Sequence, residues 1–251
     1  MKKAVKELTI RKMMVVGLLA SVSIVLGAIP GLGFIPVGPT SATIMHIPVI
    51  IGAIMEGPLV GGLIGLIFGF FSIFKAITNP TPVSFVFLNP VVSVLPRVLI
   101  GIVSYYVYKL SRDIGKRKSL WLLDIIWIML LLYLSYGLYV SIVEFTSIWS
   151  IVINMLLIIL TVIIAIYTHK NLKDKAIDII LSAALGTLTN TVGVLSAIYY
   201  LYGEQFVEKL GQSSEMARKV ILGIGIANGI PETIIAVIVV TNVVAALNRR
   251  R

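Results

Sequence analysis

The sequence contains no cysteine among its 251 residues, so disulfide bonds, thiolate nucleophiles and cysteine metal ligands are excluded. Histidine is almost as scarce, because only His46 and His169 occur, and this argues against a histidine metal site. The chain also lacks a Walker A loop, a His-Glu-x-x-His pair and the spacings of haem or zinc sites. We therefore expect a protein that is not an enzyme, uses no cofactor and binds no nucleotide of its own.

Charged residues are scarce as well. They make up 13% of the chain, about half of the roughly 25% that is typical of soluble domains. Hydrophobic residues reach 58% and the mean hydropathy is +1.03. Several apolar runs are about 20 residues long, which is the length that a helix needs to cross a hydrocarbon core of about 30 Å. No alternating pattern favours a barrel, so the sequence predicts an all-α, multi-pass membrane protein.

The positions of Lys and Arg predict the membrane topology of the chain. Eight apolar runs predict eight spans, at about 12–29, 43–56, 58–75, 93–110, 120–143, 148–168, 176–202 and 217–247. The basic residues form four clusters, at 2–12, 109–118, 170–175 and 249–251. Eight crossings place all four clusters on one side, which the positive-inside rule identifies as the cytoplasm. Both termini are therefore predicted to be cytoplasmic. We attribute the net charge of +10 to basic residues that orient the helices in a bilayer, rather than to nucleic-acid binding.

Small residues indicate which spans pack closely. Glycine recurs at every fourth position of the third span, a spacing that allows helix backbones to approach each other, at Gly57, Gly61, Gly65 and Gly69. The first span carries Gly17 and Ser21 at the same spacing. The fifth and sixth spans are bulky and nearly free of such pairs. We expect those two spans to be a peripheral, lipid-facing pair beside a bundle of the other six.

Ionisable residues inside apolar segments are costly and need a partner or a purpose. The segment from Thr40 to Gly101 carries His46, Glu56, Lys75 and Arg97. The predicted topology places Glu56 at the cytoplasmic end of its span and the other three residues toward the outside. Polar residues of the last two spans fall at a similar depth. The sequence therefore predicts one binding cavity, open to the outside and lined by His46, Lys75, Arg97, Asn190, Asn228 and Glu232.

Each of these residues also has a structural alternative. A histidine in a membrane helix can simply hydrogen-bond to another helix, and a lysine near a helix end can extend to the interface. Arg97 can neutralise Glu232 as a structural pair. Asn190 and Asn228 can hold helices together by hydrogen bonds that contribute about 1 kcal/mol each.

Four segments resemble a known family. They are ATIMHIPVIIGAIMEGPLVGGLIGLIFGFFSIFKA, NPVVSVLPRVLIG, ALGTLTNTVGVLSAIYYLYG and NGIPETIIAVIV. All four are similar to the substrate-binding (S) component of energy-coupling factor (ECF) vitamin transporters. The family core has six helices, so the resemblance assigns 1–110 and 176–251 to that core and 119–170 to an inserted pair of helices, within a single transmembrane domain, 1–251.

The resemblance implies a function. S components bind a water-soluble vitamin from outside the prokaryotic plasma membrane. They then dock on a transmembrane coupling protein driven by two cytoplasmic ATPase subunits, and topple to release the vitamin inside. The family docks through a small-residue motif in its first helix, whose matching positions here are Gly17 and Ser21. The HIPVIIG segment is most similar to the branch with pantothenate transporters, near the riboflavin binders.

The residues fit pantothenate, which is a small carboxylate with hydroxyl and amide groups. Arg97 and Lys75 can pair with the carboxylate, and Asn190 and Asn228 can bind the other polar groups. Other vitamins could bind to the same fold. The alternative hypothesis is a secondary transporter of a small organic anion, coupled to protons through Glu232, His46 and Arg97. Inverted repeats would favour that alternative, and the two halves of the sequence show none.

Overall fold

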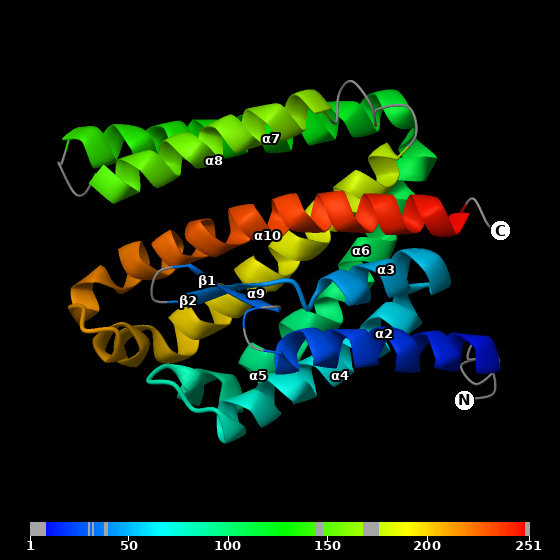
Figure 1. The fold of residues 1–251 in the computed structure, drawn as a ribbon, viewed down its shortest axis with the longest axis horizontal. Helices are drawn as coiled ribbons and strands as arrows, with labels where there is room; N and C mark the ends of the chain where they lie inside the picture. The colour runs from blue at the N-terminus through cyan, green and yellow to red at the C-terminus, as the bar shows by residue number, and fades with distance from the viewer. Residues whose placement is uncertain are drawn as a thin grey trace.

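The computed structural model describes residues 9–29, 31, 33–37, 40–143, 148–167 and 176–248. In these ranges the chain is almost wholly helical (Figure 1). The helices are α2 (Ile10–Ala28), α3 (Ile47–Glu56), α4 (Pro58–Thr78), α5 (Pro90–Ser93), α6 (Leu95–Ile114), α7 (Lys116–Val143), α8 (Ile148–Tyr167), α9 (Ile177–Lys209) and α10 (Ala217–Asn248). Two 3-10 turns, η1 (Ser84–Leu88) and η3 (Ser214–Met216), and two strands, β1 (Phe34–Val37) and β2 (Thr40–Thr43), complete the described elements.

Six of the described helical segments are long and apolar enough to cross a membrane. They are Ile10–Ala28, Pro58–Thr78, Pro90–Ile114, Arg117–Val143, Ile177–Lys209 and Ser214–Asn248. This confirms the prediction of a helical, multi-pass membrane protein. Helix α2 begins and α10 ends at the same end of the bundle, which is the geometry that an even number of crossings requires (Figure 1). Eight spans and cytoplasmic termini stay predictions.

The predicted second span, 43–56, is a helix only from Ile47 onward. Ten helical residues measure about 15 Å, roughly half of a hydrocarbon core. The residues before it belong to an antiparallel hairpin in which Phe34 pairs with Thr43 and Val37 pairs with Thr40. This hairpin falls mostly in a predicted loop, 30–42. A proline in the first turn favours the helix start at Ile47, and Gly57, with φ 106°, ends the helix immediately before Pro58 begins α4.

The sequence predicts that the glycine face of α4 packs closely on a neighbouring helix, and the structure shows that this neighbour is α6 with the residue before it. A Cβ atom added at Gly61 would lie 2.9 Å from the Cα of Gly101, and one at Gly69 would lie 2.7 Å from the Cα of Val94. At Gly65 the added atom would collide with the backbone carbonyl of Arg97. Gly57 is different, because it occupies the turn and has open space around it. The three later glycines therefore set the spacing between α4 and α6.

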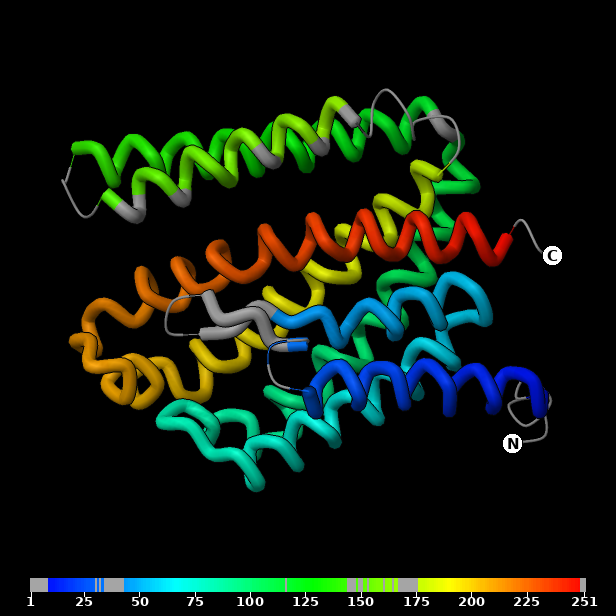
Figure 2. The backbone as a smooth tube through the Cα atoms, in the orientation of Figure 1, coloured from blue at the N-terminus to red at the C-terminus, as the bar shows by residue number. Residues whose placement is uncertain are grey.

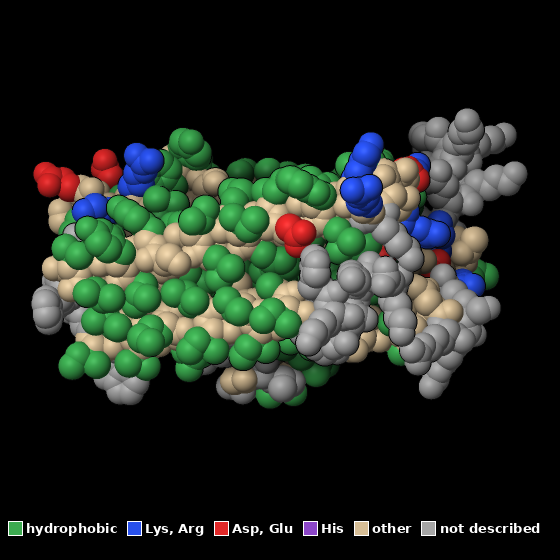
Figure 3. Space-filling view, turned by 90° about the horizontal axis from the view of Figure 1, so that it is seen from above, with side chains coloured by type: hydrophobic (Ala, Val, Ile, Leu, Met, Phe, Trp, Pro, Cys, Tyr) green, Lys and Arg blue, Asp and Glu red, His purple; other side chains and the backbone are tan. Residues whose placement is uncertain are grey.

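The buried apolar core includes side chains from several helices. Ile50 of α3, Ile64 of α4, Ile100 of α6 and Ile180 of α9 are fully buried. Helices α7 and α8 pack mainly on each other and lie to one side of this core (Figures 1 and 2). Seen from that side, the surface is hydrophobic along its length, and charged side chains gather mostly toward its two ends (Figure 3). That distribution suits a surface in contact with lipid.

We predict that Gly65→Ala lowers the stability of the protein whereas Gly62→Ala does not. Both substitutions gain the same helix propensity. The methyl group at position 65 would press on the α6 backbone, but at position 62 its nearest neighbour would be a Val98 methyl carbon at an ordinary 3.9 Å. Overpacking of this kind costs about 1–3 kcal/mol. Thermal unfolding in detergent, followed by tryptophan fluorescence, should show a lower Tm for Gly65→Ala alone. Equal Tm values for the two variants would contradict the close α4–α6 contact.

Candidate functional site

A cavity of about 500 Å³ lies between α4, α6, α9 and α10. Asn79 and residues 81–84, which follow α4, also line it, together with Lys209 and Leu210 at the end of α9. The lining includes five of the six residues that the sequence predicts to bind a ligand, namely Lys75, Arg97, Asn190, Asn228 and Glu232. Four separate helices supply these five side chains. The membrane topology predicted from the sequence therefore grouped residues that are far apart in the chain but share this lining.

Arg97 is held near the start of α6 and is only 6% exposed. Its Nη1 donates a hydrogen bond to the carbonyl of Val92 at 2.7 Å. The guanidinium carbon lies 5.4 Å from the ring centre of Phe68 and 5.9 Å from that of Phe87, within the range of cation–π contacts. The buried Nε has no hydrogen-bond partner among the described residues. Because guanidinium carries five N–H donors, Arg97 keeps donors for a ligand in the cavity.

Glu232 of α10 is 3% exposed and accepts two hydrogen bonds. Its Oε1 accepts the backbone N–H of Thr43 at 2.5 Å, and its Oε2 accepts the hydroxyl of Thr191 at 3.1 Å. These bonds connect α10 to the end of β2 and to α9. In the described part of the chain no ion pair of 4.0 Å or less joins Glu232 to Arg97. The two opposite charges therefore line one cavity without a direct contact.

Three further residues that the sequence predicts, Lys75, Asn190 and Asn228, also line the cavity. The Nζ of Lys75 donates to the carbonyl of Gly27 at 2.6 Å. That carbonyl belongs to the last turn of α2, where backbone acceptors lack helical partners and a positive charge is favourable. Asn190 is 4% exposed, and its Oδ1 has no partner among the described residues. Asn228 is buried on the facing helix α10. A buried carbonyl without a partner is costly, and a ligand donor would remove that cost.

His46 does not line the cavity, although it is fully buried. Its Nε2 lies 3.0 Å from the hydroxyl of Thr187 on α9, so it makes the helix-to-helix hydrogen bond that the sequence left as an alternative. Glu56 does not line the cavity, in agreement with the topology predicted from the sequence. Its Oε1 forms an ion pair of 3.4 Å with Arg11 at the start of α2.

Several lining residues were not identified from the sequence. Thr43, Phe87 and Phe206 all contribute to the cavity wall. Phe206 was missed because α9 continues to Lys209, beyond the predicted limit of 202. Thr43 was assigned to a membrane helix, and only strand pairing places it beside Glu232. Thr191 also lines the cavity, and its place directly after Asn190 could have signalled its role.

Gly17 and Ser21 lie together on an exposed face of α2. A Cβ atom added at Gly17 would meet no other atom within 4 Å. The Ser21 hydroxyl donates to the Gly17 carbonyl at 2.7 Å, so its polar hydrogen is satisfied within the helix. Large apolar side chains, Met14 and Leu18 among them, flank this shallow strip and are also exposed. Such a strip allows another helix to approach closely.

Comparison with known proteins supports a transport function. The family model described as "ECF transporter, substrate-specific component" matches residues 11–147 and 122–244. The pantothenic acid transporter PanT of Lactococcus lactis subsp. cremoris (strain MG1363) is 27% identical over 228 residues, which covers 85% of this chain and 81% of that protein. The pantothenate transporter PanT of Leuconostoc mesenteroides subsp. mesenteroides is 35% identical over 80 residues, or 30% of this chain and 39% of that protein.

We predict that Thr187→Val destabilises the protein by about 1 kcal/mol, because it leaves the buried His46 ring nitrogen without its partner. Thr189→Val is the matched control. Thr187 and Thr189 both donate to a carbonyl four residues earlier, but among the described residues only Thr187 also has a hydrogen bond to a side chain outside α9, that of His46. Thermal unfolding should separate the two variants. If they unfold at the same temperature, the contact between His46 and Thr187 contributes nothing to stability.

Proposed function

This chain belongs to the family of substrate-specific components of ECF transporters, and we propose that it binds pantothenate in the cavity of about 500 Å³ and delivers it through an ATP-driven ECF complex. The observation that carries the proposal is the buried Arg97 guanidinium, which lines this cavity beside amide and hydroxyl side chains. The two relatives named as pantothenate transporters support the choice of vitamin. The cell membrane is the proposed location.

Arg97 is the proposed partner of the pantothenate carboxylate. A buried positive charge is costly unless it is paired, and no acidic side chain within 4.0 Å neutralises Arg97 in the described part of the chain. Phe68 and Phe87 pack against the guanidinium, and its Nε has no hydrogen-bond partner among the described residues. Arginine binds carboxylates through two parallel hydrogen bonds, which fixes orientation as well as charge. Lys75 adds a second positive charge to the same cavity.

The amide and hydroxyl groups of pantothenate require both donors and acceptors. Asn190 and Asn228 offer both, from the neighbouring helices α9 and α10. Glu232 uses one acceptor position on each oxygen for Thr43 and Thr191, and a carboxylate has about four such positions. Glu232 can therefore accept a ligand hydroxyl while it still holds the end of β2. We assign His46 a positioning role, through Thr187, for the helix that carries Asn190.

Transport requires partners that the chain does not contain. In this proposal Gly17 and Ser21 form the docking strip for a transmembrane coupling protein with two cytoplasmic ATPase subunits. The exposure of this strip and of its apolar flanks supports that role. We further propose eight spans with cytoplasmic termini, a six-helix core of 1–110 and 176–251, and an inserted peripheral pair at 119–170. The packing of α7 on α8, to one side of the bundle, supports the last assignment.

A proton-coupled secondary transporter was the alternative. It required Glu232, His46 and Arg97 to act together in one pathway. His46 is outside the cavity lining, which weakens the alternative. Membership of the ECF family also favours a protein that binds alone and transports only with its partners.

We predict that Arg97→Gln weakens pantothenate binding about 100-fold, since loss of a buried charge pair costs about 2–5 kcal/mol. Arg112→Gln is the matched control, because Arg112 lies on the same helix but is exposed. Isothermal titration of the purified protein should show unchanged affinity for the control. The alcohol analogue of pantothenate, which lacks the carboxylate, should bind wild type and Arg97→Gln about equally. If Arg97→Gln lowers affinity for both ligands equally, Arg97 does not bind the carboxylate.

We predict that Gly17→Leu leaves pantothenate affinity unchanged but abolishes uptake in cells that also contain the ECF partners. The leucine side chain would fill the strip that another helix must approach, and its Cβ would have no atom of another element of the chain within 4 Å. Met14→Leu, on an exposed neighbouring position of α2, should transport normally. A Gly17→Leu variant that still transports at the wild-type rate would move the docking surface elsewhere.

A further inference from the structure

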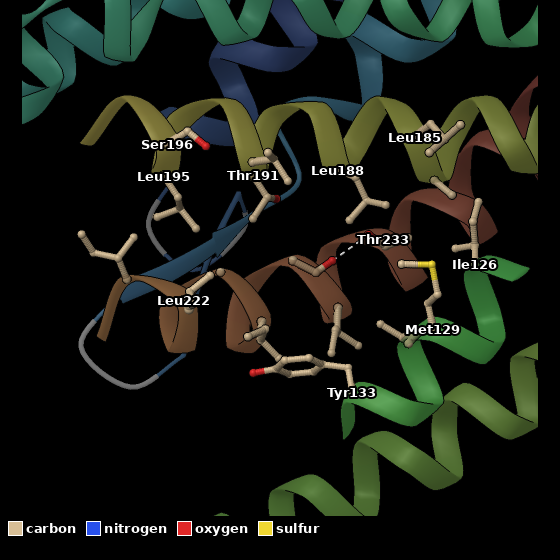
Figure 4. Close-up of a pocket in the computed structure, with 18 of the residues that line it drawn as sticks. Ile126, Met129, Tyr133, Leu185, Leu188, Thr191, Leu195, Ser196, Leu222 and Thr233 are labelled. Atoms are coloured by element: carbon tan, nitrogen blue, oxygen red, sulfur yellow. Dashed lines mark hydrogen bonds between the residues drawn. The ribbon is translucent and has the colours of Figure 1, made fainter. Parts of the chain in front are cut away.

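A second cavity, larger than the first, lies between α7 and the pair α9–α10. Its volume is about 910 Å³. Figure 4 shows how the three helices direct apolar side chains into it: Met129 from α7, Leu188 and Leu195 from α9, and Leu222 from α10. Side chains around it, Met129 and Leu222 among them, are also exposed on the surface. This cavity, the α7 groove, is therefore open to whatever surrounds the protein in the membrane.

The α7 groove carries charge at one end only. Among the described residues that line it, Arg218 in the first turn of α10 is the one charged residue, and Tyr199 and Tyr200 lie at the same end. The lining at the other end includes Ala184 and Trp127. In the described part of the chain no acidic side chain lies within 4.0 Å of the exposed Arg218 guanidinium. The groove thus has an apolar body and a single cationic end.

The length of the groove matches a lipid chain. Its lining follows α10 from Arg218 to Thr233, and fifteen residues of helix measure about 22 Å. One leaflet of a hydrocarbon core is about 15 Å thick, so an acyl chain fits along the groove with its headgroup at Arg218. Tyrosines are common at the level of headgroups, which agrees with Tyr199 and Tyr200 at that end. Pantothenate does not fit this groove, since the apolar body offers few partners for its hydroxyl and amide groups.

We propose that the α7 groove binds one anionic phospholipid, with its phosphate on Arg218 and an acyl chain between α7 and α9–α10. Arginine pairs with phosphate oxygens through two hydrogen bonds, and the net negative charge of the headgroup balances the unpaired guanidinium. The lipid fills space that the loosely attached α7–α8 pair leaves against the core. This site is separate from the proposed vitamin site and does not depend on the identity of the vitamin.

The test uses the full-length protein in nanodiscs of phosphatidylcholine with phosphatidylglycerol as the minor lipid. Native mass spectrometry after release counts the lipids that stay bound. Wild type should retain one phosphatidylglycerol molecule in preference to phosphatidylcholine. Arg218→Ala should reduce that retention about fivefold, the effect of one basic residue on an anionic lipid. Lys219→Ala is the matched control, because Lys219 is the next residue, is also exposed and does not line the groove.

A second pair of variants tests the apolar body of the groove. Ser196→Trp should fill the groove from α9 and displace the lipid, whereas Ile238→Trp, on an exposed position of α10 outside the lining, should not. All variants should keep the wild-type Tm and affinity for pantothenate. Arg218→Gln replaces Arg218→Ala if the latter does not fold. Equal retention by Arg218→Ala and wild type, an equal loss in Lys219→Ala, or equal retention of both lipids by wild type would each overturn the proposal.

Discussion

The close packing of α4 on α6 is the constraint on which the cavity depends. Three glycines of α4 let the two backbones touch, and at Gly65 the contact is with the peptide group of Arg97 itself. Any side chain there would push α6 away and would move the guanidinium with it. The same approach places Phe68 of α4 against that guanidinium. A glycine pattern that appears to concern only helix packing therefore also sets the position of the main charge in the cavity.

The burial of two charged side chains, Arg97 and Glu232, is the second constraint on the structure around the cavity. Arg97 and Glu232 are both nearly inaccessible, and each is partly satisfied by groups near it in space. A charge that is fully satisfied by the protein would gain little from a ligand, and a charge without any partner would oppose folding. The partial satisfaction seen here is the condition under which a bundle can stay folded while its cavity is empty. Backbone groups supply much of it, through the carbonyl of Val92 and the N–H of Thr43, so side-chain donors and acceptors stay available.

The sequence was sufficient for most of the helices and for five polar residues of the cavity lining, because both depend on patterns along single segments. Apolar length predicts a membrane helix, and the direction of each helix then fixes the depth of its polar residues. Five of six predicted residues consequently share one lining. The hairpin of β1 and β2 could not be predicted, since strand pairing depends on contacts between segments. His46 shows a related limit: depth predicts the level of a side chain but not the direction in which it points, and His46 points to Thr187.

Helix α9 connects the two cavities. Thr191 and Leu195 contribute to the lining of both the cavity of about 500 Å³ and the α7 groove, so the wall between them is one helix thick. Thr191 also donates its hydroxyl to Glu232, which in turn holds the end of β2. A rotation of α9 large enough to withdraw Thr191 would therefore break that bond and release one restraint on the hairpin. Helix α7 reaches this wall from the opposite side, because it contacts α9 and lines the α7 groove with it. Packed interiors transmit displacement rather than absorb it, so α7 has a physical connection to a cavity that it does not line.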